Sequence, residues 1–234
     1  MAISPLSGRT IIVTGALGAI GTGIMQCIRR HGGKPVGWDM REGPDTASVD
    51  VTDRQAVATA LAGLGDAEGL VCAAGVNAPP DGTFFSVEKE DWDRVMSVNL
   101  WGAFNVLQSW ARTRVGSGGS AVMIASIVTR MGSADNPHYV ASKGGVDALT
   151  RSAAVALGGY GIRVNAVGPG PVPSAISHRV NTEEGRAMLT ARTPMGHLGT
   201  PDNIGEAVVH LLSEASSWTT GATLYVDGGL TAGC

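Results

Sequence analysis

The feature that most constrains the fold of this chain is a glycine-rich turn set between an apolar run and a helical stretch. Thr10-Ile11-Ile12-Val13 is β-branched and apolar, which predicts a short buried strand. Residues 20–30 predict a helix, because basic residues and then His31-Gly32-Gly33 mark its end. In the turn, residues 14–21, glycines let the backbone approach a bound phosphate, and the helix that follows offers free N–H groups. The chain therefore begins with a strand–turn–helix unit suited to the phosphates of a nucleotide.

The alternation of apolar runs and helical stretches continues along the chain. The sequence predicts further strands at residues 35–39, 69–74, 121–125, 161–167 and 222–226, and helices at 54–64, 91–115, 139–157 and 207–212. The strands are apolar throughout, which favours a parallel sheet covered by helices on both faces. We therefore predict an α/β fold with a doubly wound, Rossmann-like parallel sheet, as a single domain over residues 1–234.

Composition and charge exclude several classes of partner. The chain has 234 residues, a net charge of −3 and no basic run longer than two residues, so we predict no binding to nucleic acid or to an anionic membrane. It has no leader-like N-terminus and no apolar stretch near about eighteen residues, from which we expect a soluble, cytoplasmic protein. The three cysteines (Cys27, Cys72 and Cys234) and the five histidines have neither disulfide nor metal-ligand spacing, so we predict no metal site.

Three polar residues in the second half of the chain suggest acid–base chemistry. Tyr139 and Lys143 are four residues apart, which places them on one face of a predicted helix. A lysine ammonium beside a phenol favours the phenolate, so we expect the pKa of Tyr139 to be lowered into a useful range. Ser126 follows the apolar run 121–124 and could donate a hydrogen bond to an alcohol or carbonyl oxygen. Together with the glycine turn, these residues indicate an enzyme that uses a nucleotide cofactor.

The residue at the end of the second predicted strand bears on the choice of cofactor. Asp39 lies eighteen residues after Gly21, where a carboxylate can accept hydrogen bonds from both ribose hydroxyls and repel a 2′-phosphate. We therefore predict NAD, with NADP less favoured. Arg41 lies two residues further on and could meet a 2′-phosphate, which keeps that alternative open. Asp50 and Val51 could line the adenine, while Thr52 could equally cap the helix that follows.

These residues together resemble a known family. The chain is similar to the short-chain dehydrogenases/reductases of the compact, single-domain type, over essentially its whole length. The residues that carry the likeness are the turn 14–21, Asp39, Asp50-Val51, Ala73-Ala74-Gly75, Asn99, Ser126, Tyr139, Lys143, Arg163-Val164-Asn165, Pro169-Gly170 and Asp227-Gly228-Gly229. The resemblance implies reversible hydride transfer between a secondary alcohol or ketone and the nicotinamide of NAD.

The resemblance assigns roles to four catalytic residues. Tyr139 would be the general acid and base, and Lys143 would lower its pKa and hold the nicotinamide ribose. Ser126 would orient the substrate oxygen, and Asn99 would hold a water that links the lysine to solvent. The implied cofactor-binding set is Gly15, Leu17, Gly18, Ala19, Ile20, Gly21, Asp39, Asp50, Val51, Ala73, Ala74, Gly75, Tyr139, Lys143, Pro169, Gly170, Val172 and Ser174.

The chain departs from the family pattern at two places. Ala19 stands where the usual turn has a glycine, which could weaken the pyrophosphate contact slightly. Cys72-Ala73 stands where the family commonly has two asparagines, so their side-chain contacts are missing. We expect the second change to affect local sheet stability more than chemistry.

Three segments are expected to wall the substrate pocket: 76–85, 127–138 and a lid at about 171–201, which prolines interrupt. The predicted substrate-binding residues are Ser126, Ile127, Met131, His138 and Tyr139. Further candidates are Asn77, Pro79, Val128 and Ile176, whereas Arg130 is better interpreted as a solvated loop arginine.

Two other functions stay open: an NADPH-dependent 3-oxoacyl-thioester reductase of the acyl-carrier-protein type, and a non-catalytic NAD-binding sensor or scaffold. By family analogy we expect a homo-oligomer, a tetramer or a dimer.

Overall fold

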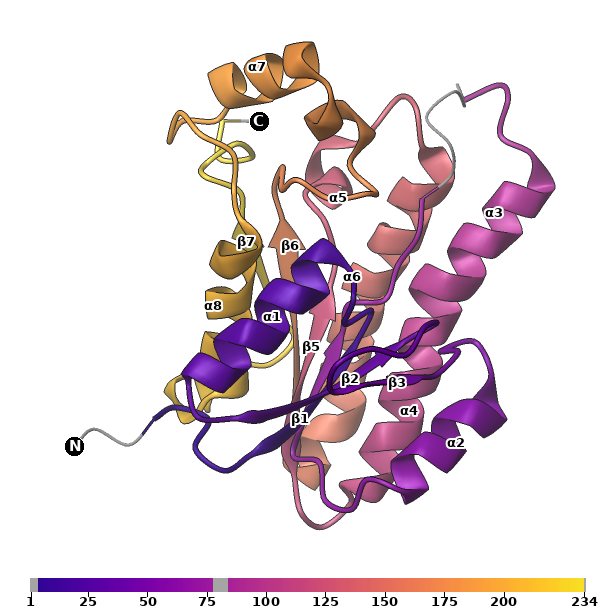
Figure 1. The fold of residues 1–234 in the computed structure, drawn as a ribbon, viewed down its shortest axis with the longest axis vertical. Helices are drawn as coiled ribbons and strands as arrows, with labels where there is room; N and C mark the ends of the chain where they lie inside the picture. Colours follow the sequence, from indigo (N-terminus) through magenta and orange to yellow (C-terminus); the bar gives the residue numbers. More distant parts are fainter. Residues whose placement is uncertain (1–3, 78–83, 234) are drawn as a thin grey trace.

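The computed structural model describes residues 4–77 and 84–233 and contains a seven-stranded sheet (Figure 1). The strands are β1 (Thr10–Thr14), β2 (Lys34–Asp39), β3 (Thr46–Ser48), β4 (Gly69–Cys72), β5 (Gly119–Ile124), β6 (Ile162–Pro169) and β7 (Thr223–Val226). Their order is β3-β2-β1-β4-β5-β6-β7, and every neighbouring pair is parallel. This order reverses direction after β1, which confirms the predicted doubly wound α/β fold.

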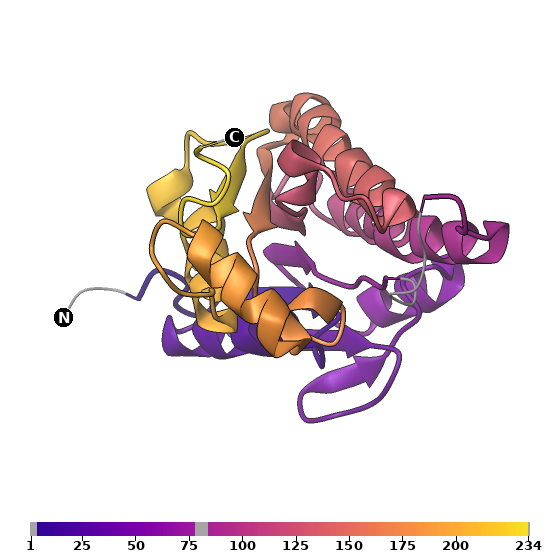
Figure 2. The same cartoon turned by 90° about the horizontal axis from the view of Figure 1, so that it is seen from above.

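Helices cover both faces of the sheet (Figure 2). They are α1 (Ala19–Arg30), α2 (Arg54–Ala62), α3 (Lys89–Met96), the π-helical η1 (Ser97–Gly102), α4 (Ala103–Thr113), α5 (Val128–Met131), α6 (Pro137–Leu157), η2 (Gly158–Tyr160), η3 (His178–Asn181), α7 (Glu183–Arg192), α8 (Pro201–Leu212) and η4 (Glu214–Ser216). In the described part of the chain, none of them combines the length and the apolar character needed to traverse a bilayer.

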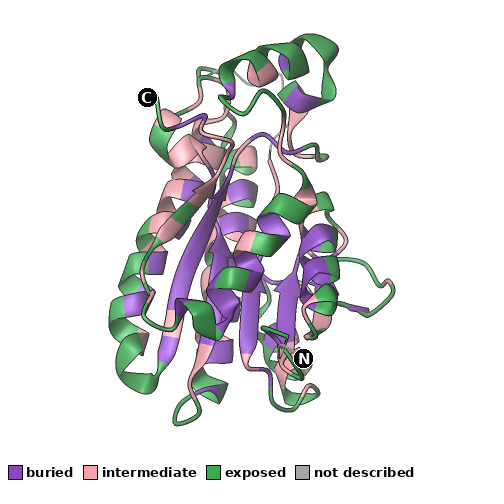
Figure 3. Ribbon diagram, turned by 90° about the vertical axis from the view of Figure 1, so that its left-hand side faces the viewer, coloured by how far each residue is buried: buried purple, intermediate pink, exposed green. Residues whose placement is uncertain are grey.

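Two buried apolar clusters, one on each face, hold the layers together. On one face α1 and α8 pack on the strands through residues such as Ile24 and Ile204; on the other, α2, α4 and α6 do so through Val57, Trp110 and Val146. Figure 3 shows the result in the central strands β1, β4, β5 and β6, which are buried along nearly their whole length. Strands buried on both faces have no polar side to alternate with, which explains the continuous apolar runs in the sequence.

The structure corrects several predicted boundaries. The stretch 91–115 is not one regular helix, because the π-helical η1 separates α3 from α4. The final helix α8 begins at Pro201 instead of residue 207, since Thr200 and Asn203 form a capping box. β3 and the lid helix α7 were not predicted. The start of α7 is nevertheless recognisable in the sequence, because Thr182 caps the helix, as Thr200 caps α8, and two glutamates follow it.

The sheet topology gathers the predicted site at one edge. Parallel strands end at the same side of a sheet, and here β1, β4, β5 and β6 are successive neighbours. Their carboxyl ends lead into the glycine turn, Ala73-Ala74, Ser126 and Pro169-Gly170. Figure 1 shows the lid, with η3 and α7, above this edge. Residues far apart in the sequence therefore meet where an open α/β sheet binds its ligands.

Candidate active site

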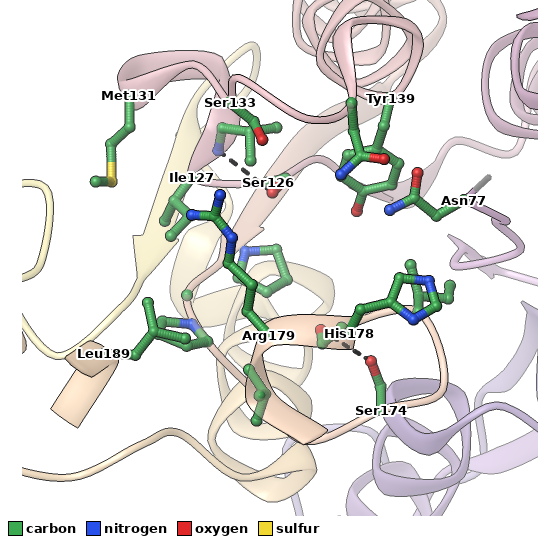
Figure 4. Close-up of a pocket in the computed structure, with 18 of the residues that line it drawn as sticks. Asn77, Ser126, Ile127, Met131, Ser133, Tyr139, Ser174, His178, Arg179 and Leu189 are labelled. Atoms are coloured by element: carbon green, nitrogen blue, oxygen red, sulfur yellow. Dashed lines mark hydrogen bonds between the residues drawn. The ribbon is translucent and has the colours of Figure 1, made fainter. Parts of the chain in front are cut away.

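Ser126 and Tyr139 meet at the end of β5. Hydrogen bonding to β6 continues past the strand, since Ala125 N donates to Val167 O at 2.8 Å and Ile127 N donates to Pro169 O at 3.1 Å. This pairing fixes Ser126, whose hydroxyl lies close enough to Tyr139, in the first turn of α6, to affect the pKa of the phenol. Ser126 Oγ also accepts a hydrogen bond from Val128 N at 3.3 Å. Both hydroxyls line one cavity, where a substrate oxygen could contact both (Figure 4).

Lys143 lies one turn after Tyr139 and is buried. Its ammonium donates a hydrogen bond to Ile124 O at 2.8 Å and lies 5.8 Å from the centre of the Tyr139 ring. Burial lowers the pKa of Lys143 to about 8, and the nearby Cys72 opposes that shift. Burial raises the pKa of the Cys72 thiol to about 12, so the thiol stays neutral at pH 7. Lys143 is therefore mostly protonated at pH 7, and no carboxylate within residues 4–77 and 84–233 forms an ion pair with it.

The expected lowering of the Tyr139 pKa by Lys143 is not found in the protein. Burial raises the pKa of Tyr139 to about 12, and the neighbouring Ser126 hydroxyl opposes this shift in part. The physical reason is the loss of solvation for a phenolate, which outweighs an ammonium that is directed at the Ile124 carbonyl. The residues of the site thus hold Tyr139 as a phenol, able to donate a proton.

Asn99 fixes the segment after β4 against α6. Its Oδ1 accepts a hydrogen bond from Val76 N at 2.8 Å, and its Nδ2 donates to Val76 O at 3.0 Å and to Ser142 Oγ at 3.0 Å. Ser142 Oγ in turn donates to Tyr139 O at 2.8 Å. Asn99 belongs to the π-helical η1, and such irregular turns are frequent at functional sites. Sequence reasoning missed Ser142, although it lies inside the Tyr-x-x-x-Lys pattern.

The glycine turn forms a close-packed cradle beside the catalytic residues. Gly15 has a φ of +66°, and a Cβ there would lie 2.7 Å from the Ala74 Cα; a Cβ at Gly21 would overlap the Gly15 carbonyl oxygen. Thr14 Oγ1 accepts hydrogen bonds from Ala73 N at 3.1 Å and Ala74 N at 3.0 Å. This threonine, which the sequence reading did not single out, ties the turn to the end of β4.

The start of α1 remains open to a ligand at its backbone. Gly18, the residue before the helix, makes no side-chain capping bond, and Ala19 is exposed at the first helical position. The Ala19 substitution therefore keeps the local geometry of the turn. The exposed methyl group of Ala19 points to solvent and does not press on the protein. Alanine in place of the family glycine therefore leaves the fold of the turn unchanged and the first N–H groups of α1 accessible to a ligand.

Asp39 lies beside the same turn, as predicted. Its Oδ2 accepts a hydrogen bond from Leu17 N at 3.1 Å, while Arg41 is exposed. Asp50 closes a local turn, because its Oδ1 accepts hydrogen bonds from both Thr52 N and Thr52 Oγ1, at 2.8 and 2.7 Å. The alternative that Thr52 caps α2 is wrong: Asp53 is the cap, and its carboxylate accepts hydrogen bonds from two helix N–H groups.

The remaining cofactor candidates lie between β3 and α2, at the ends of β4 and β6, and in the lid. Val51 is buried, and its carbonyl accepts a hydrogen bond from Asn105 at 2.8 Å. Val172 is also buried, and Ser174 Oγ donates to Ser177 Oγ at 3.1 Å at the cavity wall. The cradle, the Asp39 carboxylate and the open helix start fit a dinucleotide, with its phosphates at the turn and its ribose at Asp39.

A cavity of about 710 Å³ opens over Ser126 and Tyr139 (Figure 4). Of the predicted substrate-binding residues, Ser126, Ile127, Met131 and Tyr139 line it, as do the candidates Asn77, Val128 and Ile176. Pro79 lies outside the described residues. The lid contributes one wall, including Arg179, Leu189 and Arg192, which sequence reasoning missed. The sequence has no strong hydrophobic periodicity at these lid residues, because η3 and α7 are mostly exposed.

His138 does not line the cavity, which corrects the prediction that it binds substrate. Successive residues of a helix point about 100° apart, so the residue before Tyr139 faces elsewhere. His138 is buried, burial lowers its pKa, and the charges that act on it come from Asp91 and Arg94 of α3. Arg130 also lies away from the cavity, with its guanidinium 4.1 Å from the centre of the Tyr225 ring, so it stacks on an aromatic side chain at the surface.

Comparisons with known proteins agree with this geometry. A family model described as Enoyl-(Acyl carrier protein) reductase matches residues 15–231. L-rhamnose 1-dehydrogenase (NAD(P)(+)) from Sphingomonas sp. (strain SKA58) is 34% identical over 248 residues, covering 96% of this chain and 97% of that protein. Cis-4-hydroxycyclohexanecarboxylate dehydrogenase from Sinomonas cyclohexanicum is 35% identical over 243 residues, again covering 96% of this chain and 97% of that protein.

Comparison with solved structures also finds a dehydrogenase of the same fold. A short-chain type dehydrogenase/reductase from Mycobacterium marinum superposes with a TM-score of 0.88 and 26% identity, covering 98% of each chain. The family model matches nearly the whole chain, and the two relatives align with 96% of it. The chain belongs to the short-chain dehydrogenase/reductase family.

Proposed function

We propose that this protein is an NAD-dependent oxidoreductase that interconverts a secondary alcohol and a ketone, with Tyr139 as the general acid and base. The observation that carries the proposal is the convergence of Ser126, Tyr139 and Lys143 beside a glycine cradle and a cavity. The relatives named above are dehydrogenases, which supports the reaction class. The oxidised nicotinamide, when bound, supplies the hydride acceptor and a positive charge that favours the phenolate.

The residues of the chain divide the proton transfer among them. In oxidation, Tyr139 accepts the hydroxyl proton of the substrate, and in reduction its phenol returns a proton to the carbonyl oxygen. The Ser126 hydroxyl, which lies beside Tyr139, would donate a hydrogen bond to the same substrate oxygen. Lys143 supplies a positive charge one helical turn away, which stabilises the tyrosine while it is ionised. Asn99 positions the segment after β4 and would hold a water that links Lys143 to solvent in the proposed proton relay.

The proposed preference for NAD rests on Asp39. A carboxylate that already bonds to Leu17 N can accept ribose hydroxyls next to the turn and would repel a 2′-phosphate. One relative is named for both NAD and NADP, so the preference needs its own test. We expect fluorescence titration to give tighter binding of NADH than of NADPH, and Asp39→Asn to reduce the difference. Tighter binding of NADPH by the wild-type protein would contradict the proposal and favour a role for Arg41.

The activity itself is tested with the purified protein. Initial rates are measured by NADH formation from NAD and a panel of secondary alcohols, and in reverse from NADH and the matching ketones. We expect turnover that requires the substrate and the cofactor together. Binding of NADH without turnover of any alcohol or ketone would support the sensor or scaffold alternative, although such a protein has no need for the complete set of Asn99, Ser126, Tyr139 and Lys143.

One observation favours a second candidate. The matching family model is described as a reductase of acyl-carrier-protein thioesters, so reduction of a 3-oxoacyl thioester with NADPH is the alternative. The net charge of −3 opposes it, because an acidic carrier protein needs a basic surface for docking. Reduction of a 3-oxobutyryl thioester of pantetheine more efficiently than any free ketone would favour this alternative.

We further propose that the protein is a homo-oligomer, a dimer or tetramer, in the cytoplasm. An apolar groove on α3, η1, α4 and α6 supports the first part; its apolar lining residues are Met96, Leu100, Trp101, Phe104 and Leu149. Trp101 is 37% exposed, which is unfavourable for a large aromatic side chain in a monomer. Light scattering should give a multiple of the chain mass, and Leu100→Lys should shift it toward the monomer. Cell fractionation tests the location.

A further inference from the structure

We propose that the substrate of this site is a small hydroxy acid or oxo acid whose carboxylate is bound by Arg179 and Arg192 of the lid. This inference rests on the proposed function, since it assumes that the reacting carbon lies at Ser126 and Tyr139. It adds what the catalytic residues leave open, namely the chemical group at the far end of the substrate.

The charge of the cavity wall is the first observation. Both arginines line the cavity, Arg179 from η3 and Arg192 from the last turn of α7. Figure 4 shows the Arg179 side chain extending from the lid toward the wall formed by Ile127 and Ser126. Among the described residues that line the cavity, Asp135 is the one carboxylate. The wall therefore has more cationic than anionic side chains, which favours an anionic ligand.

The availability of the two guanidinium groups is the second observation. Arg179 forms an ion pair with Asp135, but both side chains are partly exposed, 59% and 39%, so the pair is weak and can be shared. A guanidinium has five N–H donors, and one carboxylate oxygen occupies only part of them. Arg192 forms no ion pair within the described ranges 4–77 and 84–233. Two guanidinium groups can bind a carboxylate through paired, charge-assisted hydrogen bonds.

The apolar part of the wall and the size of the cavity limit the rest of the molecule. Ile127 and Met131 on one side and Ile176 and Leu189 on the lid line the same space. They suit a short carbon skeleton between the reacting alcohol and the carboxylate. The volume of about 710 Å³ includes the region at Pro169, where the nicotinamide is expected, so a small acid fits better than a long acyl chain.

Binding is measured first, because it does not depend on turnover. The NADH-saturated protein is titrated calorimetrically at low ionic strength with cyclohexanecarboxylate and with cyclohexanecarboxamide, which differ in charge but hardly in shape. We expect the wild-type protein to bind the acid about ten- to hundredfold more tightly than the amide. Arg179→Gln or Arg192→Gln should abolish this preference for the acid. Arg186→Gln is the matched control, since this exposed arginine of α7 does not line the cavity. Equal binding of acid and amide by the wild-type protein overturns the inference.

Turnover separates this inference from the proposed function. The kcat/KM values are compared for cis-4-hydroxycyclohexanecarboxylate, its carboxamide and a 3-hydroxybutyryl thioester of pantetheine. Preference for the acid that Arg192→Gln abolishes, with the amide rate unchanged, supports both proposals. A selective, arginine-dependent binding of the acid without any turnover of alcohols would overturn the proposed function alone. Preference for the amide or the thioester, or an equal loss for all three in the variants, would overturn the carboxylate site.

Discussion

The catalytic wall of the cavity and its lid face each other but are held in different ways. Lys143 and Asn99 are almost completely buried, and their polar atoms bond to backbone groups at the ends of neighbouring strands. The lid residues Arg179 and Arg192 are exposed, and Arg179 is bound across the cavity by one partly exposed ion pair. The difference teaches that the proposed catalytic residues are held by the sheet, whereas the proposed carboxylate-binding residues belong to a surface segment.

This difference has a consequence for sequence change. Replacing the buried Asn99 amide would leave the backbone groups of Val76 unsatisfied, which is expensive, while an exposed side chain can be exchanged at little cost in stability. Lys143 differs, because its replacement also removes the cost of burying a charge. The same catalytic wall can therefore serve many substrates when the lid varies. The following predictions test whether the two walls are as different as their contacts indicate.

The largest effect is expected from Tyr139→Phe. The variant keeps the ring and loses the hydroxyl that lies in the cavity beside Ser126, so the proton has no donor or acceptor. We expect kcat to fall about a thousandfold, within the usual contribution of general acid–base catalysis. The Kd for NADH, measured by fluorescence titration, should change less than about threefold, because the cradle is untouched. A variant that keeps a tenth of the wild-type rate would show that Tyr139 is not the acid and base.

The second prediction concerns the cradle beside that wall. In Gly21→Ala the added methyl group would overlap the Gly15 carbonyl oxygen, which is backbone and cannot swing aside. We expect the free energy of unfolding to fall by about 3 kcal/mol, the upper end for overpacked sites, with loss of NADH binding. Urea denaturation measures the first and fluorescence titration the second.

Gly144→Ala is the matched control for that change. Gly144 lies inside α6, and nothing lies within 4 Å of the position of its Cβ. Alanine favours a helix interior over glycine, so the variant should be unchanged or more stable by up to about 1 kcal/mol. Equal destabilisation by both substitutions would mean that the close approach of Gly15 and Gly21 does not determine the effect.

Much of this architecture could be predicted from the sequence. Buried parallel strands leave continuous apolar runs, and the pattern located β1, β2, β4, β5, β6 and β7 within a few residues. It missed β3, whose three residues are too short for a periodic signal. It also missed the π-helical η1, because a single-turn irregularity depends on how Asn99 bonds to Val76 and not on hydrophobic periodicity.

The candidate site was predicted unevenly, for physical reasons. Residues that act through their own chemistry, such as Tyr139 and Lys143, have a recognisable spacing. Thr14 and Ser142 act by bonding to backbone or to another side chain, and only the folded structure brings those partners together. The direction of the Tyr139 pKa was wrong, since the sequence shows a neighbouring charge but not the loss of solvent. Spacing in the sequence identifies which side chains are neighbours on a helix, but the burial that shifts their pKa values depends on the folded structure.

The third prediction concerns the cost of burying Lys143. In Lys143→Met the buried ammonium is removed, together with its hydrogen bond to Ile124 O. We expect loss of activity but a gain of about 1–3 kcal/mol in the free energy of unfolding at pH 7, because burial of the charge depresses the native pKa from 10.5 to about 8. Urea denaturation of the two proteins checks this difference.

The pH dependence of that gain distinguishes charge burial from better packing. Between about pH 8 and 10.5 the unfolded wild-type chain binds more protons at this lysine than the native state, so wild-type stability rises with pH. The methionine variant lacks this rise, and its advantage should shrink over the same range. Lys34→Met, at an exposed position, is the control for the change in net charge. An advantage that stays constant or grows with pH would contradict the assigned cost.

The smallest effect is expected at the lid, from Asp135→Asn. This change removes the ion pair to Arg179, whose side chains are 39% and 59% exposed. Exposed pairs contribute about 0–1 kcal/mol, so the free energy of unfolding should fall by less than about 1 kcal/mol in urea denaturation. Added salt screens such a pair, and the difference between the two proteins should decrease further at high ionic strength. A loss of several kcal/mol would mean that the lid is held as firmly as the catalytic wall. The contrast between the two walls would then have to be abandoned.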